Sequence, residues 1–140
     1  MALVATYLNL PGTTEEAFEF YKSVFGTEYA GQGVMRMGDT PADPDAPPMS
    51  DEQKRMVIHV SLPILAGHLL MGTDAPDAKI GDNVQIMLNP DTRQEADDLF
   101  AKLSEGGTVL SPMADMFWGD YWGALTDKFG INWMVDIENV

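Results

Sequence analysis

The chain has 140 residues, 45% of them hydrophobic, and its 22 acidic and eight basic residues give a formal net charge of −14. This charge repels phosphates, so it disfavours a nucleic-acid partner or an anionic membrane surface. The absence of cysteine excludes a disulfide scaffold, a thiolate metal site and a cysteine nucleophile. No basic leader or membrane-length apolar run is present, so we expect a cytoplasmic protein that makes no membrane contact.

The first elements are a strand and a helix. Residues 4–10 alternate as a strand does, and Pro11-Gly12 ends it. Thr13 and Glu16 have the spacing of a capping box, which predicts that the helix begins at Thr13. Apolar residues then recur at helical spacing up to Gly26, which predicts a helix lying on a sheet; they are Ala17, Phe20, Tyr21 and Val24.

The next stretch predicts strands around a long loop. Residues 27–37 indicate a second strand, weakened by two glycines. Residues 39–54 are rich in proline and acid, which predicts an exposed loop. The loop either covers a site as a lid or is a solvent-exposed connection without that role. Residues 55–62 and 68–73 predict a hairpin.

The second half repeats this order. Residues 83–88 predict a strand, and a helix follows with Asp91 as its N-cap and Gln94 three places later. Residues 117–137 predict a hairpin in which Gly130 takes a positive φ at the turn. This hairpin holds every tryptophan of the chain, so its aromatic area covers a core, a cavity or a partner. The tryptophans are Trp118, Trp122 and Trp133.

A shift of 79 residues lays the first strand and helix on the second pair. The identical positions are Pro11 on Pro90, Thr13 on Thr92, Glu16 on Glu95 and Ala17 on Ala96. Together with the matching order of elements, they predict two βαβββ units, at about 1–75 and 80–140. We therefore expect one α+β domain made of two repeats.

Several stretches are similar to a known family. They are residues 7–10, 15–26, 67–72, 88–91, 117–119 and 126–135. In these stretches the chain resembles the vicinal oxygen chelate superfamily and, within it, the PhnB-like, glyoxalase and bleomycin-resistance-related group. The resemblance implies two βαβββ modules whose curled mixed sheets surround a cavity, often completed by a homodimer. Helices would cover the sheet faces turned away from the cavity.

Metal-dependent members of this superfamily place ligands, mostly His and Glu, at four strand positions. The resemblance puts these positions at Thr6, about Met71, Gln85 and about Met134. This set does not hold a hard or borderline divalent ion, which prefers carboxylates and imidazoles. We therefore predict no metal and no cofactor.

The same positions can line a binding cavity. Alternation predicts that Thr6, Leu8 and Leu10 share one face of the first strand, with Gln85 and Met87 on the matching face of the fifth. The adaptable thioethers of Met71 and Met134 would form the far walls. Aromatic walls would come from Trp118 and Tyr121. The alternative is that the methionines fill a closed core.

Two residues are candidates for catalysis. His59, flanked by Ile58 and Val60, could act as a general base or a ligand contact, or could be a hydrogen-bonded structural histidine. Its face is not fixed, because a one-residue slip in the hairpin register reverses it. Asp120, beside Trp118 and Tyr121, is the acidic candidate.

The leading hypothesis is a metal-free, homodimeric PhnB-like protein that binds a small hydrophobic or aromatic molecule. Loss of the ligand positions favours binding over turnover, and whether the chain is an enzyme stays open. The alternative is a metal-dependent glyoxalase- or dioxygenase-type lyase or isomerase. Its divalent ion would be held at other positions, using His59 with Asp120 or Asp136.

Overall fold

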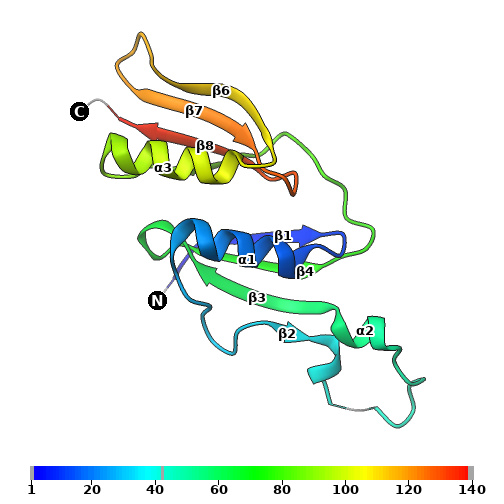
Figure 1. Ribbon diagram of the computed structural model, residues 1–140. Coiled ribbons are helices and arrows are strands. Elements are labelled where there is room, and N and C mark those ends of the chain that lie inside the picture. The colour runs from blue at the N-terminus through cyan, green and yellow to red at the C-terminus, as the bar shows by residue number, and fades with distance from the viewer. Residues whose placement is uncertain (1, 42, 139–140) are drawn as a thin grey trace. The chain divides into compact units, whose positions relative to one another are not determined.

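The computed structural model describes residues 2–41 and 43–138, and the chain divides into two compact units between Lys79 and Ile80 (Figure 1). Each unit contains a four-stranded mixed sheet with a 12-residue helix packed on one face. The predicted α+β class is confirmed. Among the described residues, no helix is long and apolar enough to span a bilayer.

The first unit has a sheet of order β1-β4-β3-β2. β1 runs parallel to β4, and the other neighbours are antiparallel. Its elements are β1 (Thr6–Leu10), α1 (Thr14–Phe25), β2 (Met35–Arg36), η1 (Met37–Asp39), α2 (Asp51–Arg55), β3 (Val57–Pro63), η2 (Leu65–Gly67) and β4 (Leu69–Asp74).

Helix α1 lies on the sheet through its apolar stripe, as the spacing predicted. Ala17, Phe18 and Tyr21 are fully buried. A Cβ atom at Gly72 would lie 2.6 Å from Phe18 Cε1, so glycine lets the phenyl ring rest on β4. Gly72 therefore marks the face of the sheet that α1 covers.

The start of α1 is held by a distant carboxylate. Thr13 makes no side-chain capping bond, so the predicted capping box with Glu16 is wrong. Instead, Asp74 Oδ1 accepts the N–H of Thr14 at 3.1 Å, and Asp74 Oδ2 accepts the N–H of Val57 at 2.9 Å. Asp74, at the end of β4, thus satisfies a helix N–H and the first N–H of β3.

The stretch before β3 differs from its prediction. The expected strand at 27–37 is reduced to Met35–Arg36. The expected loop at 39–54 ends in helix α2, because Ser50 and Gln53 form a reciprocal capping box at its start. Whether the remaining loop acts as a lid stays untested.

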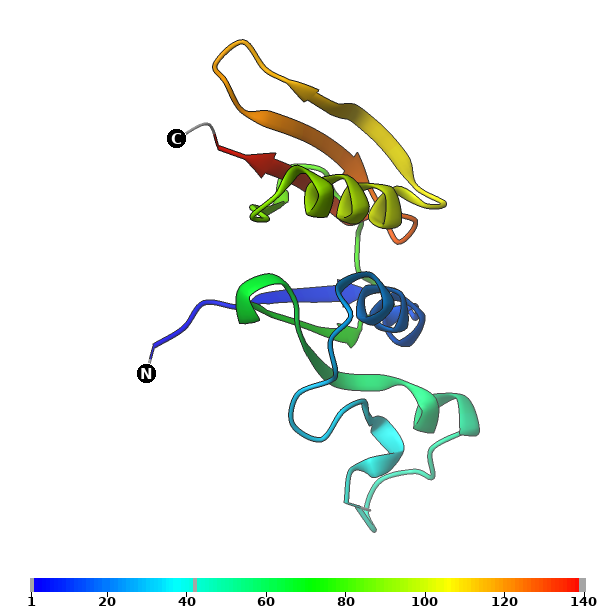
Figure 2. The same cartoon turned by 60° about the vertical axis from the view of Figure 1, so that its left-hand side comes forward.

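The second unit has a sheet of order β5-β8-β7-β6, with β5 parallel to β8. Figure 2 shows β6, β7 and β8 of this sheet in yellow, orange and red. Its elements are β5 (Ile86–Leu88), α3 (Arg93–Ser104), β6 (Thr108–Asp115), β7 (Tyr121–Thr126) and β8 (Asn132–Ile137). The cap of α3 is Thr92, which accepts the N–H of Glu95 at 3.1 Å, so the predicted Asp91–Gln94 cap is one residue early. Gly123 of β7 accommodates the Phe100 ring of α3.

The hairpin of β7 and β8 turns on Asp127, which is 3% exposed. Asp127 Oδ1 accepts the N–H groups of Phe129 and Ile131, at 2.8 and 3.1 Å. Asp127 Oδ2 accepts the indole N–H of the fully buried Trp133 at 2.8 Å. Gly130 has a φ of 87°, as the predicted turn requires.

Candidate functional site

The face of the first sheet opposite α1 carries a mixed polar and apolar row. Strand pairing aligns Tyr7, Met71 and Ser61 across β1, β4 and β3, and it aligns Met35 of β2 with His59. Their neighbours in sequence, including Leu8, Val60 and Leu70, are buried on the α1 side. We call these five residues, with Asn9 beside them on β1, the first open face.

Tyr7 and His59 meet on this face. The Tyr7 hydroxyl lies 3.5 Å from His59 Nδ1, and the two ring centroids are 6.0 Å apart at 32°. This contact fixes the orientation of His59, which the sequence left open. At 3.5 Å the hydrogen bond is weak, so both groups can turn to another partner. The Tyr7 side chain is about half exposed.

Ser61 lies in the same row with its hydroxyl unsatisfied. The residue is 8% exposed, and its Oγ has no hydrogen-bond partner among the described residues. Its carbonyl accepts the N–H of Ala30 at 2.9 Å, so the backbone oxygen is bonded while the side-chain hydroxyl has no described partner. A buried hydroxyl in this state costs roughly 1–3 kcal/mol relative to a satisfied one. Such a group calls for an explanation, and a bound molecule is one.

The matching face of the second sheet has a different character. Met87, Met134 and Ala124 align across β5, β8 and β7, and Trp122 pairs with Asp136 beside them. We call these five residues the second open face. Burial, followed by the hydrogen bond and charge of Asp120, raises the pKa of Asp136 to about 6.

Two predicted cavity residues face the helices instead. Leu8 is 8% exposed and lies under α1, because Tyr7 and Asn9 take the open side of β1. The Tyr121 hydroxyl donates to Asp97 Oδ1 of α3 at 2.6 Å, and the Arg93 guanidinium lies over its ring at 4.3 Å. The faces assigned to Leu8 and Tyr121 were therefore wrong.

The 79-residue shift holds for the helices and fails for the strands. Helices α1 and α3 begin at Thr14 and Arg93, which are 79 residues apart. The buried strand residues Leu8 and Leu88 are 80 residues apart. One residue fewer separates Leu88 from the start of α3 than separates Leu8 from the start of α1, and this difference reverses the face expected for every side chain carried over from β1.

Because of this one-residue difference, Thr6 and Gln85 do not occupy equivalent positions in the two units. Thr6 Oγ1 lies 2.9 Å from His68 Nε2, which accounts for the second imidazole of the chain. Gln85 is exposed and precedes β5. Of the predicted contacts, His59 and Met71 lie on the first open face, and Met87 and Met134 lie on the second. Whether any of them contacts a ligand stays a prediction.

The tip of the β6–β7 hairpin holds the remaining predicted residues. Trp118 is 53% exposed and stacks edge-on against Phe117, with ring centroids 5.0 Å apart. The Asp120 carbonyl accepts the N–H of Met116 at 2.7 Å and closes the turn. Sequence reasoning missed Tyr7, Ser61 and Trp122, and correct strand parity would have found Tyr7.

The four positions of the metal-dependent relatives do not suit a divalent ion. Thr6 is bonded to His68, Gln85 lies outside the strand, and Met71 and Met134 offer only thioethers. In the part of the chain that the structure describes, no three His, Asp or Glu residues come together as a metal would require. The donor chemistry therefore does not fit the superfamily's metal.

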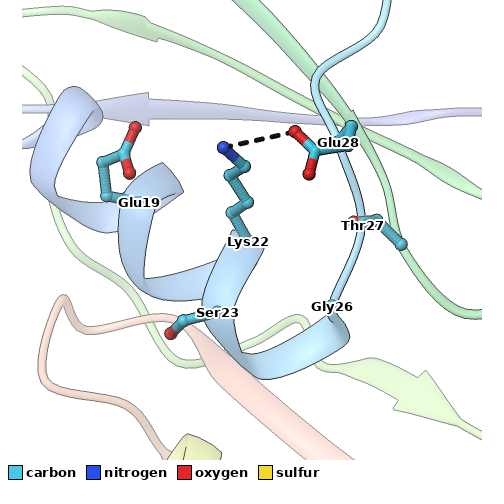
Figure 3. Close-up of a pocket in the computed structure, with 6 residues that line it drawn as sticks. All are labelled: Glu19, Lys22, Ser23, Gly26, Thr27 and Glu28. Carbon is cyan, nitrogen blue, oxygen red and sulfur yellow. Dashed lines mark ion pairs between the residues drawn. The ribbon is translucent and has the colours of Figure 1, made fainter.

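A shallow surface depression lies elsewhere, at the C-terminal end of α1 (Figure 3). Its lining residues are Glu19, Lys22, Ser23, Gly26, Thr27 and Glu28. Lys22 forms an ion pair with Glu28 at 3.4 Å, and Glu19 accepts the Tyr29 hydroxyl at 2.8 Å. Its charged groups already have partners, so we assign it no ligand.

Comparisons with known proteins agree with this fold. Residues 10–135 match the family model of the glyoxalase/bleomycin resistance protein/dioxygenase superfamily. The chain is 22% identical to protein YjdN of Escherichia coli K12 over 138 residues, which cover 96% of this chain and 94% of that protein.

Solved structures give the same result. Protein PA1353 of Pseudomonas aeruginosa matches with a TM-score of 0.80 and 31% identity, over 99% of this chain and 98% of that one. A PhnB protein of Bacillus cereus matches with a TM-score of 0.75 and 26% identity, over 98% and 100%. The chain therefore belongs to the glyoxalase/bleomycin resistance protein/dioxygenase superfamily and is similar in structure to the PhnB protein of Bacillus cereus.

Proposed function

We propose that this protein binds a small hydrophobic or aromatic molecule on the first open face, without a resident metal. The observation that carries the proposal is the buried Ser61 hydroxyl, which has no partner among the described residues and lies beside the loosely bonded Tyr7–His59 pair. Binding sites typically combine an apolar lining with a few polar groups that orient the ligand. The first open face has this composition.

The apolar part of the contact comes from Tyr7, Met35 and Met71. A ring laid on these side chains gains aromatic stacking and sulfur–aromatic contacts. Met71 is the cross-strand neighbour of Ser61 and is only partly buried. Its unbranched side chain can move to admit a ligand group to the serine hydroxyl.

The polar part comes from three hydrogen-bonding groups that carry no fixed charge. Ser61 Oγ can donate and accept, and the Tyr7 hydroxyl and the His59 imidazole can each exchange their 3.5 Å bond for a ligand bond. These groups can orient a hydroxyl or carbonyl substituent. His59 is also the catalytic candidate if the bound molecule is converted.

The absence of a resident metal belongs to the proposal and rests on the donor set at the family positions. The competing function is a metal-dependent lyase, isomerase or dioxygenase whose ion is held elsewhere. Native mass spectrometry of untagged protein, purified without chelators, separates the two. The proposal expects the bare polypeptide mass, and one Zn, Ni, Mn or Fe per protomer would establish the competing function.

A homodimer is the second element of the proposal, and the same spectrum tests it. β1 and β5 each end a sheet and pair on one side only in the described residues. Exposed edge strands invite pairing with another chain. The exposed side chains of Met87, Val109 and Leu110 support an apolar contact. A purely monomeric spectrum would contradict the dimer without affecting the binding site.

The binding site itself is tested by titrating 2-naphthamide into ¹⁵N-labelled protein and following amide shifts. We expect shifts in β1, β3 and β4, and we expect Tyr7→Phe and Ser61→Ala each to weaken binding several-fold. Tyr121→Phe is the matched control, because its hydroxyl lies on the α3 side. Equal losses in all three variants, or shifts confined to other elements, would contradict the proposed site.

A further inference from the structure

The strands of both sheets are almost devoid of positive charge. Across β1 to β8, the only lysine or arginine is Arg36 of β2. Its guanidinium is bound to the Glu15 carboxylate of α1, with Nη1 2.9 Å from Oε1, and it donates to the Arg55 carbonyl at 3.3 Å. Arg36 therefore points to the helix side and is already neutralised.

The first open face consequently offers groups without a fixed charge. Its polar atoms are the hydroxyls of Tyr7 and Ser61, the amide of Asn9 and the imidazole of His59. Thr73, the cross-strand neighbour of Asn9, adds a hydroxyl that donates to the Val57 carbonyl at 3.3 Å. None of the strand residues on this face carries a fixed positive charge.

An anion placed on such a face would lose hydration without gaining an ion pair. Burying a charge without a partner costs far more than burying a neutral polar group that can hydrogen-bond. Anion sites normally supply arginine or lysine for this reason. The whole chain, at −14, adds a long-range repulsion of the same sign.

We propose that the ligand of the first open face is an uncharged, ring-bearing molecule with a hydroxyl or carbonyl group, and that this face rejects carboxylates and phosphate esters. This selectivity rests on the proposed function, because it concerns the same site. The Ser61 hydroxyl recognises the neutral oxygen, and the lack of a cation excludes its anionic analogue.

The direct test compares matched probes at pH 8, where free imidazole is neutral. The probes are 2-naphthamide, its near-isostere 2-naphthoate, and 2-naphthyl phosphate, titrated calorimetrically into the full chain. We expect 2-naphthamide to bind at least tenfold more tightly than either anion. Equal affinity for 2-naphthamide and 2-naphthoate would overturn the selectivity while leaving the proposed binding function intact.

Salt separates the local effect from the net charge. The Debye length falls from about 10 Å at 0.1 M to about 3 Å at 1 M salt, which screens long-range repulsion. We expect the preference for 2-naphthamide to persist at 1 M NaCl. A preference that disappears there would assign it to the overall charge and would overturn the local explanation.

A gain-of-function variant tests the location. Asn9→Arg places a cation on the exposed side of β1, next to Thr73. We expect its affinity for 2-naphthoate to rise at least tenfold, with circular dichroism confirming the fold. Gln94→Arg, on the exposed surface of α3, makes the same charge change in the other unit and should have no effect.

The remaining outcomes are also decisive. An equal rise in both arginine variants, or no rise in a folded Asn9→Arg protein, would show that anions are excluded elsewhere and would overturn the inference. Absence of binding for all three probes would remove the binding function together with its selectivity. Failure of the selectivity and failure of the function are therefore distinguishable.

Discussion

The two units have the same strand order and helices of equal length, but their open faces differ. The first carries a phenol, an imidazole and a buried hydroxyl, whereas the second carries two methionines, a tryptophan and a carboxyl. On the helix side of each sheet, a strand glycine accommodates a phenylalanine ring of the helix. The comparison shows that packing constrains one face of each sheet and leaves the other free for chemistry.

The largest expected effect compares the carboxylates that organise the units. Asp127→Ala leaves three N–H groups without their acceptor, including the buried Trp133 indole, and should lower the free energy of unfolding by about 3–5 kcal/mol. Asp74→Ala releases the N–H groups of Thr14 and Val57 and should cost about 2–3 kcal/mol. Urea unfolding measures both.

Asp127→Asn serves as the control for this pair, because it keeps an oxygen for the turn amides while removing the charge. Its loss should be smaller than that of Asp127→Ala. A larger loss of stability for Asp74→Ala than for Asp127→Ala would contradict this expected order.

The next effect concerns the glycines under the helices. A methyl group at Gly72 would meet the Phe18 ring at 2.6 Å, and one at Gly123 would meet the Phe100 ring at 2.9 Å. Each Gly→Ala change should lower stability by about 1–3 kcal/mol through overpacking. Gly81→Ala, where the nearest atom is 3.8 Å away, should change it little. Thermal denaturation of the three variants side by side would expose any difference in how tightly the units are packed.

One carboxyl group in each unit should also make folding stability depend on pH, and the two dependences should run in opposite directions. The raised pKa of Asp136, about 6 against an ordinary 3.8, means that the folded state holds this proton more tightly. The resulting contribution to the free energy of unfolding is fully present below about pH 4 and is lost as the pH rises through about 6. In the first unit, the Arg36 hydrogen bond lowers the pKa of Glu15, so its contribution is lost as the pH falls.

Asp136→Asn isolates the first of these terms. The amide resembles the protonated acid and does not titrate. Between pH 4 and pH 7, the free energy of unfolding of the variant should therefore rise by roughly 1–2 kcal/mol relative to that of the wild type. Urea unfolding at both pH values measures the gain. A gain that is independent of pH would mean that Asp136 does not titrate in this range.

The smallest effect on stability should come from Ser61→Ala. The change removes a hydroxyl without a described partner, so stability should stay within about 0.5 kcal/mol of the wild type or rise. Binding of 2-naphthamide should nevertheless weaken. A variant that loses stability but binds normally would make Ser61 a packing residue and would reduce the contrast between the two open faces.

Apolar spacing and Gly130 act over a few positions, and they predicted α1, α3 and the β7–β8 turn. Both predicted caps were wrong, because Asp74 holds the start of α1 across 60 residues and Thr92 replaces Asp91 at α3. Helix α2 was missed, since its stretch was expected as a loop. On β1, Leu8 was assigned to the cavity side, where Tyr7 lies instead. Both are apolar enough for either side, and the one-residue difference between the repeats appears only when the strands are paired.

Sequence reasoning also identified only part of the candidate site. Met71 and Met134 were named from the resemblance, Met87 from strand alternation and His59 from its chemistry, and all four lie on the open faces. Ser61 was missed because its interest comes from an unmet hydrogen bond, which is a property of the packed state. No sequence pattern distinguishes it from other serines in strands.

The Asp74 contacts also bear on how the chain folds during synthesis. The carboxylate that caps α1 and holds the first N–H of β3 is the last residue of β4. While the ribosome has exposed only β1 and α1, the first turn of that helix lacks this acceptor. The N-terminal unit should therefore acquire its native order in one late step, once β4 has left the exit tunnel.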